Sequence, residues 1–137
     1  MPHVSKQKLD KETLNQISER LITIIIKLQN KDEASAFLED LLTKTERIML
    51  AKRLAITIML ERGYPFQVIS QSLKVSEATI SVMRDRIDRG GRGFKNILEK
   101  LEKDRSIEKL LKILDTIISA FAMPPIAGKG RWKFLYK

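Results

Sequence analysis

Apolar residues recur at helical spacing along nearly the whole chain, from Leu9 to Ala122. The alternation of β-branched residues that is typical of strands is almost absent before the C-terminal tail. The pattern therefore predicts an all-α protein, a multi-helix bundle. Helices are expected at roughly residues 10–30, 33–42, 44–62, 94–101 and 106–122, with two more between about 65 and 88.

The first of these helices has an apolar surface that is too wide for a single core-facing stripe. A helix of this kind is usually buried on more than one side, so it needs partners on more than one side. The residues that form the surface are Leu14, Ile17, Leu21, Ile22, Ile24, Ile25, Ile26 and Leu28.

The helix expected at 44–62 carries signals at both ends. Thr43 is a good N-cap and Glu46 follows three residues later, which together make a capping box. Gly63 is a candidate C-cap, and Pro65 falls where a first-turn proline is tolerated in the following helix.

The segment from Tyr64 to Arg84 has the layout of a helix-turn-helix, a motif whose second helix, the recognition helix, enters the major groove of DNA. A short apolar helix ends in a tight turn at residues 74–76, and a second helix begins at once. Inward-facing positions are expected at Val68, Ile69 and Leu73 in the first helix and at Ile80, Met83 and Ile87 in the second.

In the first two turns of the recognition helix, the side chains that do not face the core are expected to touch bases. Ala78 and Val82 suit thymine methyl groups, and Glu77 suits a cytosine amine. Because these turns contain no Arg or Asn, we expect modest direct readout with a contribution from DNA shape. Small hydroxyl side chains able to bind phosphates are Ser76, which is also the expected N-cap, Thr79 and Ser81.

Positive charge follows at the far end of the recognition helix and beyond it, where it is expected to hold the DNA backbone. The alternative is a solvated helix face with internal pairs between arginines and the neighbouring Asp85 and Asp88. The cations are Arg84, Arg86, Arg89, Arg92 and Lys95.

Gly90, Gly91 and Gly93 are expected to form a helix-ending turn, since no strand precedes them and the Lys-Ser/Thr pair of a phosphate-binding loop is missing. The last expected helix has an apolar face that needs a partner surface. The tail after it alternates Trp132, Phe134 and Tyr136 with basic residues. These aromatics would suit single-stranded bases, a partner protein or an apolar patch of the protein's own dimer.

Composition narrows the class of protein. The 137 residues are 43% hydrophobic, which is enough for a core, and a formal charge of +9 favours a polyanionic partner. The absence of Cys excludes disulfides and Cys-containing zinc sites. The polar N-terminal residues lack a signal-peptide pattern, and no apolar run is long enough for a membrane span, so a cytoplasmic protein without a membrane partner is expected.

An enzyme is not expected. His3 is the sole histidine, there is no cysteine nucleophile, and the carboxylates show no convergent pair. No catalytic or metal-binding residue is therefore assigned, and no cofactor is expected.

With the motif and its upstream helix in view, residues 42–101 resemble the Trp repressor superfamily, particularly its Trp-repressor-like branch. The handful of matching segments are Leu42-Thr43, Glu46-Arg47, Leu50, Arg53, Arg62-Gly63, Leu73, Ala78-Thr79-Ile80-Ser81 and the glycine-rich Gly90-Gly91-Arg92-Gly93-Phe94-Lys95. The resemblance implies an all-helical, intertwined homodimer. We expect the chain to consist of a Trp-repressor-like helical DNA-binding domain at 1–103, an additional helix at 104–122 and a basic aromatic tail at 123–137.

The resemblance also implies a ligand pocket, in which Arg53 and Thr43 match positions that bind tryptophan in other members. A second arginine and the glycine after it are replaced here by Val82 and Met83. We therefore do not expect tryptophan to be the co-repressor. Whether another small molecule has that role is left open, and Arg53 could equally be an exposed helical residue or the partner of a carboxylate.

The sequence thus predicts a sequence-selective, DNA-binding transcriptional regulator. We expect a repressor that binds a near-palindromic operator on double-stranded DNA as a homodimer, with recognition helices roughly 34 Å apart. The alternative is a structural or interaction protein whose aromatic-basic tail docks a protein or a single-stranded nucleic acid.

Overall fold

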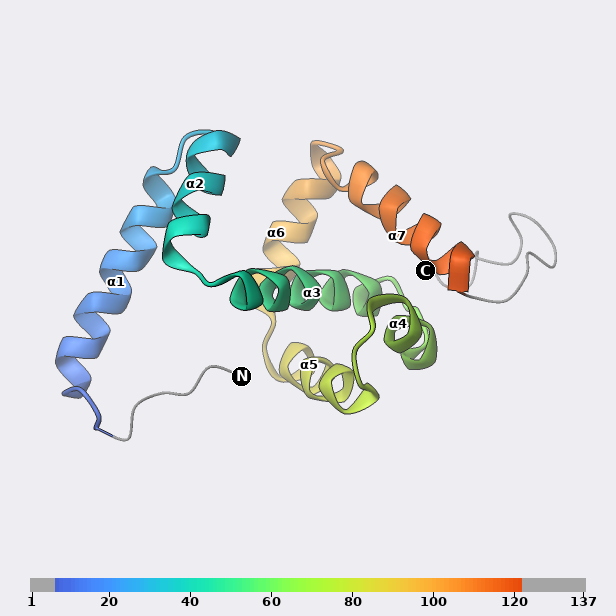
Figure 1. The fold of residues 1–137 in the computed structure, drawn as a ribbon, viewed down its shortest axis with the longest axis horizontal. Helices are drawn as coiled ribbons and strands as arrows, with labels where there is room; N and C mark the ends of the chain where they lie inside the picture. The colour runs from blue at the N-terminus through green and yellow to red at the C-terminus, as the bar shows by residue number, and fades with distance from the viewer. Residues whose placement is uncertain (1–6, 122–137) are drawn as a thin grey trace. The chain divides into compact units, whose positions relative to one another are not determined.

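The computed structural model describes residues 7–121, and these form helices without any strand, which confirms the all-α class (Figure 1). The chain divides into two compact units between Met49 and Leu50. In order, the helices are α1 (Lys11–Lys27), α2 (Lys31–Leu41), α3 (Lys44–Glu61), α4 (Phe66–Leu73), α5 (Glu77–Arg89), α6 (Arg92–Lys103) and α7 (Ile107–Phe121).

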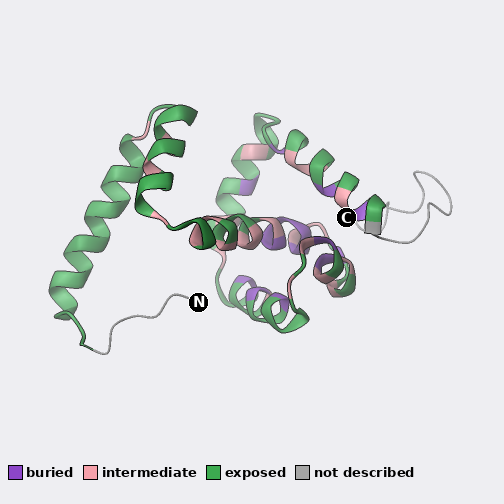
Figure 2. Ribbon diagram, in the orientation of Figure 1, coloured by how far each residue is buried: buried purple, intermediate pink, exposed green. Residues whose placement is uncertain are grey.

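The first unit contains α1 and α2, and neither helix has a buried residue (Figure 2). Asp10 caps α1 by accepting from the Thr13 N–H at 3.4 Å. Asn30 accepts from the Glu33 N–H at 2.8 Å and so begins α2, whereas the sequence pattern had placed it at the end of the first helix. Residues 29–33 are all polar, so the side-chain cap at Asn30 lies where the apolar pattern of the first helix has already ended.

The second unit holds the core, which α3 to α7 build together. The C-terminal half of α3 is buried from Ile56 to Leu60, while Ile69 of α4 is fully buried (Figure 2). Side chains of α5, α6 and α7 complete the core, and the helix pairs α4–α5, α4–α7 and α6–α7 are in contact. The unit therefore folds α4 and α5 around a core that includes a helix far downstream in the chain.

Both ends of α3 have the local geometry expected from the sequence. At its start, the Thr43 hydroxyl accepts from the Glu46 N–H at 3.1 Å and the Glu46 carboxylate accepts from the Thr43 N–H at 2.8 Å, which confirms the capping box. At its end, Gly63 has φ 82°, and its N–H and that of Tyr64 donate to Leu60 and Met59. This is a Schellman motif.

The helix boundaries after α3 differ slightly from those expected. Pro65 is the N-cap of α4 and lies just outside its first turn. Gly90 is the C-cap of α5 and Gly91, with φ 71°, is the N-cap of α6. Gly90 therefore ends a helix as expected, but α6 begins directly after Gly91 and includes Gly93 in its first turn.

Helix α7 is an integral part of the second unit. Ile107, Leu114 and Ile118 are at most 4% exposed. The Tyr64 hydroxyl, in the turn between α3 and α4, donates to the Asp115 carboxylate at 3.1 Å. The apolar face that the sequence left without a partner is thus buried in the core at these three positions.

Candidate nucleic-acid interface

Helices α4 and α5 form the expected helix-turn-helix. Lys74 takes the left-handed conformation, φ 56° and ψ 51°, at the C-cap of α4. The Ser70 hydroxyl donates to the Val75 carbonyl at 2.6 Å, and the Val75 N–H donates to the Ser70 carbonyl at 3.3 Å. From α3, the Lys52 ammonium donates to the Lys74 carbonyl at 3.4 Å. The turn is thus fixed by contacts on both sides.

The recognition helix α5 rests on the core through one face. Ile80 and Ile87 are fully buried and Met83 is 4% exposed, as the spacing predicts. The Ser76 hydroxyl caps the helix by accepting from the Thr79 N–H at 3.2 Å, and the two hydroxyl groups are 2.9 Å apart. The opposite face of α5 is consequently turned toward solvent.

All the side chains expected to touch bases lie on this exposed face. Glu77, Ala78, Ser81 and Val82 are exposed, and Val82 is 63% exposed. Ser76 and Thr79 are exposed as well, although their hydroxyl groups already bond to each other in the cap. The structure thus brings the predicted set together on one helix, and its contact with DNA stays a prediction.

The five cations fall into two groups. The Arg89 guanidinium bonds to the Asp85 carboxylate at 3.0 Å, and that of Arg84 bonds to Asp88 at 3.0 Å. The alternative of internal Arg/Asp pairs is correct for these two arginines. The other three of the five, Arg86, Arg92 and Lys95, are exposed and form no ion pair with any described residue.

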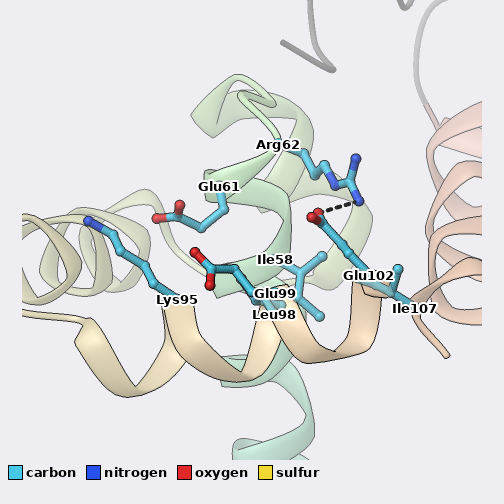
Figure 3. A pocket seen from close by; sticks show the side chains of 8 residues that line it. All are labelled: Ile58, Glu61, Arg62, Lys95, Leu98, Glu99, Glu102 and Ile107. Carbon is cyan, nitrogen blue, oxygen red and sulfur yellow. Dashed lines mark hydrogen bonds and ion pairs between the residues drawn. The ribbon is translucent and has the colours of Figure 1, made fainter. Parts of the chain in front are cut away.

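An open pocket of about 400 Å³ lies between α3 and α6 in the same unit (Figure 3). Its floor includes Ile58 and Leu98, and its rim is charged. An ion pair between Arg62 and Glu102, 3.0 Å long, crosses one end of it. The pocket belongs to the α3–α6 packing and contains none of the residues expected to touch bases.

Thr43 and Arg53, which the resemblance matches to a ligand pocket, stay a prediction as ligand-binding residues. Thr43 is exposed and its hydroxyl belongs to the capping box. Arg53 is half-buried, and its guanidinium forms no ion pair with any described residue. Met83 lies in the core next to the exposed Val82. The tail with Trp132, Phe134 and Tyr136 lies outside the described residues.

Sequence patterns missed the polar contacts between α3 and the motif. Lys52 and Glu61 of α3 contact Lys74 and Arg84, which are more than 20 residues away. No local signal marks such pairs, because only the packing of α3 against α4 and α5 brings them together. Of the described residues, no group of His, Asp and Glu could hold a metal ion, and no helix is long and apolar enough to cross a membrane.

A family model described as Trp repressor protein matches residues 16–102. The match begins within α1, includes all of α4 and α5, and ends before α7. No curated protein matches the chain, and no solved structure matches it either.

Proposed function

This chain belongs to the Trp repressor protein family, which makes it a DNA-binding transcriptional regulator, and from that premise we propose that it is a homodimeric repressor of near-palindromic operators. The observation that carries the proposal is the exposed face of α5. A helix seated by three buried side chains presents a small and uncharged surface at Ala78, Ser81 and Val82. Such a surface can approach base edges closely.

The exposed apolar side chain of Val82 supports a role in binding. It is 63% exposed and adds nothing to the core. Together with Ala78, one helical turn earlier, it would cover thymine methyl groups in the major groove. Glu77 would accept from a cytosine amine, and Ser81 would reach a phosphate.

The unpaired cations support binding to the DNA backbone. Arg86, Arg92 and Lys95 follow the base-contacting turns and are exposed. Arg89 is 81% exposed, so its surface pair with Asp85 can exchange for a phosphate at little cost. These residues would hold the backbone while the earlier turns of α5 contact bases.

The first unit supports the homodimer. Its long helix α1 has no buried residue, and apolar side chains that water would otherwise surround need a partner surface. A second copy of the chain supplies that surface in an intertwined dimer. The exposed apolar residues of α1 include Leu14 (50%), Ile17 (54%), Leu21 (40%), Ile22 (57%), Ile24 (43%), Ile25 (52%) and Ile26 (76%).

The proposal does not include tryptophan as a ligand. A planar cation is missing at Val82, and Met83 fills space in the core. The repressor would therefore act without this amino acid as a co-repressor.

The proposal is tested by selecting bound fragments from genomic DNA with purified protein at two salt concentrations. The test variant is Ala78→Asp with Val82→Asp, which places two negative charges on the base-contacting face. The control is Thr116→Asp with Ser119→Asp, which adds the same charge on exposed positions of α7. We expect a near-palindromic site that the wild type and the control select and that the test variant loses. Equal binding of all fragments by all three proteins would contradict the proposal.

A further inference from the structure

Arg84 differs from the other cations of α5 in where its side chain lies. It follows the buried Met83 and is one helical turn beyond the buried Ile80, so it starts at the edge of the core-facing side. Its side chain is 33% exposed, whereas that of Arg89 is 81% exposed. The Nε atom of Arg84 is buried and has no hydrogen-bond partner. An arginine that contacted only solvent or DNA would extend its guanidinium away from the protein.

The guanidinium of Arg84 instead reaches the C-terminal end of α3. Its Nη2 atom is 3.7 Å from the Glu61 carboxylate and 3.0 Å from the Asp88 carboxylate. Its Nη1 atom donates to the Leu60 carbonyl at 3.5 Å. The last carbonyl groups of a helix carry partial negative charge, so a cation is favoured there. Arg84 thus joins the recognition helix to the last turn of α3.

Helix α3 holds the motif at a second point. Lys52 donates to the carbonyl of Lys74 in the turn between α4 and α5. The two contacts lie at different places along α5, one before its start and one in its third turn. Apolar packing at Ile80, Met83 and Ile87 holds α5 against the core. The two polar contacts are directional, so they also restrict the orientation of α5, which apolar packing alone does not.

From these contacts we infer that Arg84 is a positioning residue, which sets the rotation of α5 about its own axis and thereby the discrimination between operator and other DNA. The inference rests on the proposed function. It assigns Arg84 a part other than the phosphate contact that the sequence alone suggests.

Helix geometry explains why this position matters. Successive residues turn by about 100°, so Val82 lies roughly 200° around the helix from Arg84. Ala78, four residues before Val82, lies near it on the same face. Arg84 therefore contacts α3 from the face of α5 opposite the one that carries the base-contacting side chains. A rotation released by its loss would move both side chains away from the base edges together.

The test compares Arg84→Met, Glu61→Gln and the double variant with the wild type. Methionine keeps the length of the side chain and its helix propensity while removing the charge. Glu61→Gln removes the partner charge on α3 without touching the recognition helix. The control is Arg86→Met, the loss of an exposed and unpaired cation two residues away.

The measurement is affinity for the selected site and for unrelated DNA across a salt series, well below the melting temperature. For Arg84→Met and Glu61→Gln we expect the ratio of the two affinities to fall about tenfold, as for a single mismatched base pair. Affinity for unrelated DNA and its salt dependence should not change, and the double variant should add little to either single one. Arg86→Met should weaken both affinities alike and reduce the salt slope by about one.

Two results would overturn the inference. A uniform loss of affinity with a smaller salt slope in Arg84→Met would make Arg84 a phosphate contact. An unchanged affinity ratio in Glu61→Gln would mean that the contact with α3 does not position the helix. A wild-type protein without sequence preference would instead contradict the proposed function, and the inference with it. Hydrogen exchange without DNA gives a separate readout, since loss of positioning should speed exchange of α5 amides in both variants.

Discussion

At the scale of single residues, the capping box of Thr43 and Glu46 makes the start of α3 depend on the charge of the Glu46 carboxylate. The Thr43 N–H, and then its hydroxyl, hold the pKa of the Glu46 carboxyl below its ordinary value of 4.5. A lowered folded-state pKa means that the ionised carboxylate is the form that stabilises α3. This contribution to stability is fully present above a pH of about 4.5 and is lost as the pH falls through the folded-state pKa.

We therefore expect the Glu46 carboxyl to titrate below 4.5 in an NMR titration of its side chain. The matched variant Glu46→Gln keeps an oxygen acceptor but has no proton to gain. The stability of the wild type relative to this variant should fall as the pH drops below about 4.5 and should level off above it. A carboxyl that titrates at or above 4.5 would contradict the expectation.

A second prediction at this scale concerns tryptophan. Because Met83 is buried in the core and Val82 offers no planar cation, we expect no saturable binding of tryptophan at micromolar concentrations. Isothermal calorimetry measures this directly, with a tryptophan-binding family member as the positive control. Saturable heat that indicates micromolar affinity would show that other residues complete a pocket.

At the scale of elements, the sequence predicted well what neighbouring residues decide. The caps at Thr43 and Ser76 and the buried spacing in α5 follow from residues within one or two turns, and the structure confirms them. The first helix was expected to reach Asn30, but it ends at Lys27 and Asn30 caps α2, because capping and not apolar spacing decides where a helix ends. The contact of Arg84 with Glu61 was not predictable, since it depends on how α5 packs against α3.

The junction of α5 and α6 provides a test with a built-in control. Gly91 has φ 71°, and a Cβ atom there would lie 2.8 Å from the Ile87 carbonyl oxygen. Gly91→Ala should therefore lower the free energy of unfolding by at least about 1–2 kcal/mol. At Gly93 a Cβ atom would meet nothing within 4 Å, so Gly93→Ala should raise it, by up to about 1 kcal/mol.

Chemical denaturation of the two variants and the wild type measures both effects. Equal destabilisation by Gly93→Ala and Gly91→Ala would show that the left-handed backbone at Gly91 and the nearby Ile87 carbonyl are not the cause of the loss.

At the scale of the whole molecule, the two units differ in how they bury apolar surface. The second unit has a core of its own, whereas α1 and α2 have no buried residue. In the proposed dimer, covering α1 would make the stability of the first unit depend on protein concentration. The family match includes most of α1, so dimer formation and DNA binding belong to the same proposal.

We expect light scattering to give the mass of a dimer for the wild type and a lower mass for Ile25→Glu at the same concentration. Ile25 is 52% exposed, and a carboxylate there would be buried without a partner in the dimer. Gln16→Glu adds the same charge to a polar position of α1 and should keep the dimer. A monomeric wild type at high micromolar concentration would rule out the interface on α1.

The burial of α7 in the core has a consequence for how the protein is made. Leu114 and Ile118 complete a core whose other members include Ile69 in α4. The hydrogen bond from the Tyr64 hydroxyl to the Asp115 carboxylate likewise requires α7. Synthesis at about 5–20 residues/s would leave the helix-turn-helix without this cover for roughly 1.5–6 s after α5 has been translated. During that interval a nascent chain would have α5 before it has the complete core on which α5 packs. Translation itself would thus delay the first moment at which a new molecule can bind DNA.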